Sequence, residues 1–174
     1  MRKMMSSIVF TLACSLLNGR LLAAGMEEAI KARAQKCVQA TADDDYEGIV
    51  ACTHPLVIEM NGGKEHMLSI LQQGSADMKS SGADIESVEI GEPQQLGQMP
   101  QLSYALVPQT IRMKVPQGKL IQDGWLLAIS TDQGSSWNFV DATNLTDATL
   151  GQVFPELAGK IKLPAKTAPR IEEN

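Results

Sequence analysis

The chain has 174 residues, with 20 acidic against 15 basic side chains and a formal net charge of −5 at pH 7. This length suits one domain with a modest hydrophobic core. The acidic balance, without a basic patch interleaved with aromatic residues, argues against nucleic acid as a partner. After the N-terminal segment no apolar run approaches the roughly 20 residues of a membrane span, so we expect none.

Residues 1–25 have the organisation of a signal peptide. Its parts are a charged start, a short apolar core and a small-residue cleavage site: Arg2–Lys3, Ile8–Leu17 and Ala23–Gly25. We predict cleavage after Gly25, which places the mature protein in the periplasm or outside the cell. A domain from 26 to 160 follows, and residues 161–174, rich in Pro, Lys and Glu, are expected to form a flexible tail.

The three cysteines of the sequence divide into one in the predicted signal peptide and two in the mature chain. Cys14 ends the run Leu-Ala-Cys, which resembles the end of a bacterial lipobox, so a lipoprotein anchored at Cys14 is an alternative. Cys37 and Cys52 would reach an oxidising compartment, where we expect them to form a disulfide. A catalytic thiol is the other interpretation, but neither cysteine has a nearby activating pair.

Helical periodicity dominates the first half of the domain. We predict helices over Met26–Ala40, Tyr46–Thr53 and Lys64–Lys79. A disulfide between the first two would clamp a helical hairpin. The third helix is expected to turn a set of apolar side chains toward the core, namely Met67, Leu68, Leu71 and Met78.

The acidic run Asp43–Asp45 also has the spacing that opens a calcium-binding loop, with Gly48 at its sixth position. The bidentate glutamate that such a loop needs at its twelfth position is replaced by His54. We therefore interpret the acidic run as N-terminal caps for the helix that follows. Neither a metal nor another cofactor is expected.

From Ala83 onward the apolar period changes to two. Alternating segments cover residues 85–90, 102–107 and 111–115, and the apolar run Trp125–Ile129 suits a central strand. A short terminal helix is expected over Asp147–Leu157. Helices followed by hairpin-connected strands predict an α+β fold, in which the N-terminal helices pack on a curved, four-stranded antiparallel sheet.

The central hairpin contains the pattern Ser130-x-Asp132-x-Gly134-x-x-Trp137. Asp132 is placed to accept hydrogen bonds from backbone N–H groups, Gly134 allows positive φ, and Trp137 is placed to cover the turn. The pattern resembles the Asp-box of sialidases, in which this hairpin is structural. Because the chain lacks the repeats of a propeller, we expect a structural turn and not a sialidase.

The element order together with the run from Gly124 to Asp141 resembles the nuclear-transport-factor-two-like cone, a cystatin-like superfamily, and in particular its exported bacterial members without assigned activity. That resemblance implies a curled sheet with a pocket. Because the sequence contains no recognisable catalytic set, we expect a non-enzymatic binding or interaction module for a small apolar ligand or a protein partner. The alternative is an isomerase, dehydratase or hydrolase with an acid–base residue in the pocket.

The weak candidates for such an acid or base are His54, His66, Asp123 and Asp141. None matches a catalytic motif of the superfamily. His54 is more simply a helix cap and His66 a surface residue, while Asp123 and Asp141 are placed to hydrogen-bond strand ends. No serine, cysteine or zinc-ligand constellation accompanies them.

The strand at residues 102–107 is apolar on both faces, because Leu102, Tyr104 and Leu106 alternate with Ser103, Ala105 and Val107. One face must meet the N-terminal helices, and an exposed apolar patch on the other is rarely tolerated. Two ways of covering the second face are possible. One is a twofold partner, which makes the protein a homodimer. The other is the C-terminal segment, with Leu150, Val153, Phe154 and Leu157 as its apolar residues.

Overall fold

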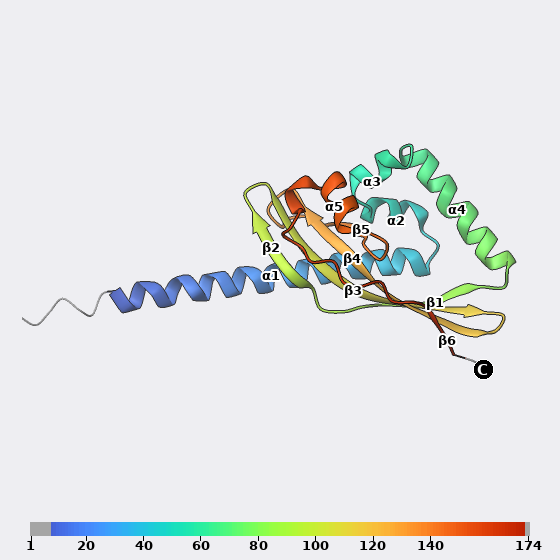
Figure 1. Ribbon diagram of the computed structural model, residues 1–174, viewed down its shortest axis with the longest axis horizontal. Helices are drawn as coiled ribbons and strands as arrows, with labels where there is room; N and C mark the ends of the chain where they lie inside the picture. The colour runs from blue at the N-terminus through green and yellow to red at the C-terminus, as the bar shows by residue number, and fades with distance from the viewer. Residues whose placement is uncertain (1–7, 173–174) are drawn as a thin grey trace, which may run out of the picture.

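The computed structural model describes residues 8–172, with side chains from residue 23 onward. The chain forms an α+β fold in which helices precede and flank an open, curved antiparallel sheet (Figure 1). In chain order the elements are α1 (Ile8–Ala42), α2 (Tyr46–Cys52), α3 (Pro55–Met60), α4 (Lys64–Ser80), β1 (Asp84–Ile90), β2 (Gln94–Met99), β3 (Leu102–Val115), β4 (Gly118–Ser130), β5 (Asn138–Asp141), α5 (Asp147–Val153), the 3₁₀-helix η1 (Pro155–Leu157) and β6 (Arg170–Glu172).

The sheet is built on the long β3–β4 hairpin. Its main strand order is β1-β3-β4-β5, while β2 pairs with the first part of β3 and β6 with the first part of β4. The described residues thus form six strands where the sequence predicted four. The predicted segments 102–107 and 111–115 form one continuous strand that includes Pro108. The sequences of β2 and β6 lack a strong alternating pattern, so these strands were not predicted.

Both faces of the sheet are covered. Ala105 and Val107 face α1 and pack with its buried Ile30 and Ala34. Leu102, Tyr104 and Leu106 face the other way and pack with the C-terminal segment, through Leu150, Phe154 and Leu157. Of the two covers considered for the second face, the structure shows the C-terminal segment. The apolar surface on which the expectation of a homodimer rested is buried within the chain.

Helix α1 begins at Ile8 and continues through the predicted cleavage site, so it is longer than the predicted Met26–Ala40. Its first half projects away from the sheet and the other helices (Figure 1). Packing against the α1-side core begins at Met26 and continues with Ile30. Arg2 and Lys3 of the predicted signal peptide lie outside the described residues, as does the side chain of Cys14. Within residues 8–172 no helix combines the length and hydropathy that a membrane span requires.

The helical hairpin of α1 and α2 is closed by the Cys37–Cys52 disulfide, whose Cα atoms are 5.9 Å apart. Asp45 caps α2 by accepting a hydrogen bond from the Gly48 N–H group at 3.0 Å. Both features follow the sequence predictions. Helix α4 departs from them, because it packs against α2 and α3 instead of the sheet, and none of its side chains is fully buried. Its predicted core residues Met67, Leu68, Leu71 and Met78 are half-buried.

The segment expected as a flexible tail lies against the sheet as far as it is described. Ile161 is buried, and Gln95 of β2 exchanges two hydrogen bonds with the backbone of Lys162. The chain then crosses to β4, where Lys119–Ile121 pairs with β6. Residues 173 and 174 lie outside the described part. The C-terminal segment therefore continues the cover that α5 and η1 begin.

Candidate functional site

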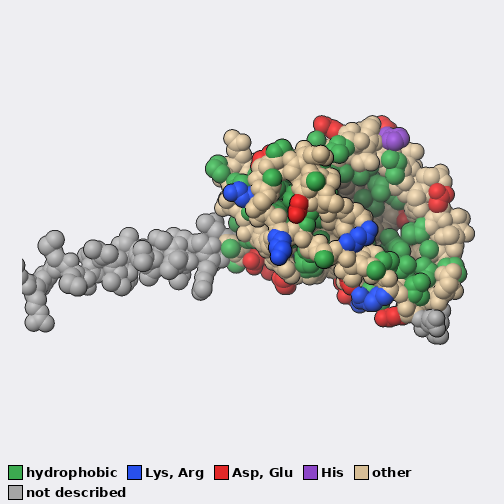
Figure 2. All heavy atoms as spheres, in the orientation of Figure 1, with side chains coloured by type: hydrophobic (Ala, Val, Ile, Leu, Met, Phe, Trp, Pro, Cys, Tyr) green, Lys and Arg blue, Asp and Glu red, His purple; other side chains and the backbone are tan. Residues whose placement is uncertain are grey.

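A cavity of about 240 Å³ lies between the helices and the α1-facing side of the sheet. Figure 2 shows a hollow between α4 and the sheet with hydrophobic side chains inside it. The lining is mainly apolar and comes from both layers: Ala34, Cys37, Val38, Thr41, Ile49, Cys52, Thr53, Val57, Met67, Val88, Ile90, Gln109, Leu126, Phe139, Val140 and Asp141. An apolar cavity of roughly 150 Å³ in another protein binds benzene. This cavity is large enough for a somewhat bigger ligand.

The floor of the cavity follows from strand register. Leu126 pairs with Asp141 and with Val107, which faces α1, so these side chains share one face of the sheet. Phe139, two residues before Asp141, lies on the same face. Ile90 pairs with Gln109 and extends this face across β1 and β3. The curved sheet thus presents aliphatic and aromatic carbon to the helices.

The helical wall is fixed covalently, because both disulfide cysteines line the cavity. The roof is less firmly held. Met67 is the lining residue that α4 supplies, and α4 begins after Gly62 and Gly63, which have φ of +80° and +91°. Exposed ion pairs of Lys64 with Glu47 and of Lys79 with Asp44 connect α4 to α2 and to the turn before it. Such pairs contribute little each.

Asp141 is the candidate acid–base residue that lines the cavity. It ends β5 at the solvent-exposed rim, on the same face as Leu126 and Phe139. Its Oδ1 atom accepts a hydrogen bond from the Thr143 N–H group at 2.9 Å. The sequence interpretation as a strand-end acceptor is compatible with this bond. The structure adds a location that the sequence did not distinguish, since Asp141 places a carboxylate at the mouth of an apolar cavity.

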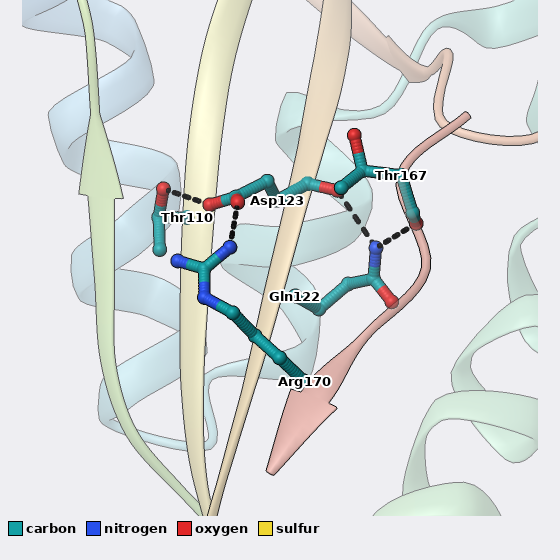
Figure 3. Close-up of polar contacts among 5 residues, drawn as sticks. All are labelled: Thr110, Gln122, Asp123, Thr167 and Arg170. Carbon is teal, nitrogen blue, oxygen red and sulfur yellow. Dashed lines mark hydrogen bonds and ion pairs between the residues drawn. The ribbon is translucent and has the colours of Figure 1, made fainter. Parts of the chain in front are cut away.

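Asp123 lies elsewhere and holds the C-terminal strand (Figure 3). Its carboxylate accepts hydrogen bonds from Thr110 Oγ1 at 2.8 Å and from the Arg170 guanidinium at 2.5 Å. The Arg170 bond, followed by the Thr110 bond, lowers the pKa of Asp123. Gln122 strengthens the same attachment by donating to the Thr167 carbonyl at 3.3 Å. Asp123 is therefore a structural anion, ill suited to accept a proton as a base.

The two histidines are also outside the cavity lining. His54 caps α3, with its Nδ1 atom accepting from the Leu56 N–H group at 3.3 Å, and its ring meets Phe154 edge-on at 5.1 Å. Partial burial lowers the pKa of His54, which favours the neutral ring that this cap requires. His66 is exposed and donates from Nδ1 to the Asn61 carbonyl at 2.8 Å. Both positions fit the structural interpretation.

The turn between β4 and β5 is organised by Asp132. Its carboxylate accepts from the Ser136 hydroxyl at 2.5 Å, the Ser136 N–H group at 2.8 Å and the Ser130 hydroxyl at 2.7 Å. These bonds, those of Ser136 first, lower the pKa of Asp132 to about 2. Gly134 has φ of +92°, and its carbonyl accepts from Trp137 Nε1 at 3.1 Å.

Trp137 is only 2 % exposed and belongs to the core on the α1 side of the sheet. Its carbonyl accepts from Arg33 Nε at 3.2 Å, so the turn also fastens α1. None of Ser130, Asp132, Gly134 and Trp137 lines the cavity. Their contacts are those of a structural turn.

Sequence reasoning missed most of the cavity lining. Met67 was predicted only as a core residue and not as part of a ligand site. Val88 and Gln109 carried no functional signal. Their proximity depends on the register between β1 and β3 and on the path of α4. No protein-family model matches this sequence, and no curated protein matches it either.

Proposed function

We propose that the mature protein is an exported, non-enzymatic binding module that holds a small apolar ligand in the cavity beneath α4. The observation that carries the proposal is the cavity itself, which has room for a small ligand and a mainly apolar lining. Small-molecule sites are concave and mostly apolar, with a few polar groups to orient the ligand. Here the polar lining groups are Thr41, Thr53, Gln109 and Asp141.

Export to the periplasm or the outside is part of the proposal. The Cys37–Cys52 disulfide is of the kind that persists in oxidising compartments. Packing against the core begins at Met26, the first residue after the predicted cleavage site, so cleavage would remove no described core contact. Anchoring through Cys14 remains the alternative form of export. Helices packed on a curved antiparallel sheet also support membership of the nuclear-transport-factor-two-like superfamily, which we propose on that ground.

A small-molecule isomerase, dehydratase or hydrolase is the second candidate, and the position of Asp141 favours it over other enzyme classes. A carboxylate base in an apolar cavity, assisted by hydrogen-bond donors, is sufficient for proton abstraction next to a carbonyl. Asp141 would be the base and Gln109 the available donor, because the hydroxyl groups of Thr41 and Thr53 already donate to the carbonyls of Cys37 and Ile49. The cavity lining contains no histidine and no second carboxylate to complete an acid–base pair.

The binding proposal is tested by titrating the exported, disulfide-bonded protein with a small neutral apolar probe such as benzene or hexanol, followed by NMR. Val88→Phe fills the cavity from β1, and Ile85→Phe enlarges a half-buried side chain of the same strand outside the lining. Saturable shifts in the wild type and in Ile85→Phe, with at least tenfold weaker binding by Val88→Phe, are expected. Equal binding by all three proteins, or by none, would contradict the proposal that the cavity is a ligand site.

A further inference from the structure

We propose that the ligand of this cavity carries one protonated amine on a small apolar body, and that Asp141 is the group that recognises the amine. This inference rests on the proposed binding function and adds the charge and the orientation of the ligand. The apolar part would lie among Leu126, Phe139 and the helical wall. The ammonium would lie at the mouth.

The charge of the lining has one sign. Asp141 is the formally charged residue among those that line the cavity, and no lysine or arginine lines it. The whole chain is also acidic, with a net charge of −5. An anionic head group would therefore be repelled by the carboxylate of Asp141, whereas a cation would be attracted by it. Carboxylate-headed ligands such as fatty acids are disfavoured.

The hydrogen-bonding geometry has capacity for such a head group. Asp141 uses Oδ1 for the Thr143 N–H group, and an ionised carboxylate has about four lone-pair sites, so acceptor sites remain. An ammonium has three N–H donors and no acceptor. Gln109 and the threonines Thr41 and Thr53 supply further oxygens along the lining. A donor-rich, acceptor-free head group matches this set better than an acceptor-rich one.

The size of the cavity restricts the apolar body. A volume of about 240 Å³ exceeds the roughly 150 Å³ that accommodates benzene and lies below the range of roughly 300–1,000 Å³ typical of drug-sized ligands. A chain of several methylenes or a single substituted ring fits this interval. A complete two-chain lipid does not. The ligand class is accordingly a small amphiphilic amine.

The test compares three probes with the same six-carbon body: hexylamine, hexanol and hexanoate, titrated separately at pH 7 and followed by NMR. For the wild type we expect hexylamine to bind roughly fivefold tighter than hexanol, and hexanoate to bind more weakly than either. Asp141→Asn should bring hexylamine and hexanol within about twofold of each other. Glu156→Gln is the matched control, because it removes one exposed acidic charge from the C-terminal cover on the other face of the sheet and should leave the order unchanged.

The outcomes separate this inference from the proposed function. If none of the probes binds, the binding function itself fails. If hexanol binds at the cavity but hexylamine binds no better, or if Asp141→Asn keeps the preference, the cavity is a binding site and the amine assignment is wrong. If Glu156→Gln also loses the preference for hexylamine over hexanol, the preference arises from the net charge of the protein, and the role of Asp141 is overturned.

Discussion

The cover of the second sheet face makes Leu157→Ala a sharp test of the fold. Leu157 lies in η1, is 0 % exposed, and packs in the cluster that contains Tyr104, Leu106 and Leu127. Leucine-to-alanine substitutions at buried sites cost about 3 kcal/mol or more, from lost transfer free energy and the residual cavity. For a chain of this size that corresponds to a fall of roughly 6–12 °C in Tm.

The assay is urea unfolding followed by circular dichroism, with Ile171→Ala as the control. Ile171 belongs to the same C-terminal segment but is 54 % exposed, so its truncation should change stability by about 0.5 kcal/mol or less. Light scattering on the wild type should give a monomeric mass, since both apolar faces of residues 102–107 are covered within the described chain. Equal, small effects of the two substitutions, together with a dimeric mass, would mean that a partner subunit covers the face instead.

Three further predictions concern the turn and the disulfide. Gly134→Ala should lower the free energy of thermal unfolding by about 1–2 kcal/mol, because φ is +92° and the new Cβ would lie 3.2 Å from Met26 Sδ. The control, Gly74→Ala in the exposed interior of α4, should stabilise the protein by up to about 1 kcal/mol. The folded-state pKa of Asp132 is lowered from 3.8 to about 2, so its stabilising contribution is present above pH 4 and is lost as the pH falls toward 2; urea midpoints of Asp132→Asn should therefore decline less steeply over this interval than those of the wild type. Replacing Cys37 and Cys52 together by serine should lower the free energy of unfolding by about 3 kcal/mol for a loop of 15 residues, and the native mass should be smaller than the reduced mass by the two thiol hydrogens.

The parts of the fold that sequence predicted are those with local causes. The turn from Ser130 to Trp137 depends on a glycine at positive φ and on a carboxylate that bonds within four residues. The disulfide pairing followed from the two cysteines that lie outside the predicted signal peptide. Helix caps such as Asp45 and His54 have the same local character.

The parts that sequence did not predict depend on contacts between distant segments. β6 has three residues and is held by pairing with β4 and by the Arg170–Asp123 bond across 47 positions. The alternation in residues 102–107 identified two apolar faces but could not decide which cover each receives. Helix α4 has an apolar stripe typical of a core helix. The path of the chain after Gly63 nevertheless packs α4 against α2, so that Met67 lines the cavity.

The same distinction explains the four candidate acid–base residues. Their residue types were equally suggestive in the sequence. The register of β5 against β4 places Asp141 beside Leu126 at the cavity, whereas Asp123 pairs with Thr110 of β3 and bonds Arg170 at the C-terminal strand. A catalytic interpretation of Asp123, His54 or His66 has no support from their positions. Asp141 is the residue on which the amine assignment and the enzymatic proposal both depend.

The most direct test of the central claim is an NMR measurement of intermolecular contacts in the wild-type protein with bound hexanol. We predict nuclear Overhauser effects from the hexanol methylenes to the methyl groups of Met67 and Val88, which enter the cavity lining from α4 and β1. Contacts confined to exposed side chains such as Met60 or Ile70, with none to Met67 or Val88, would contradict a ligand site beneath α4.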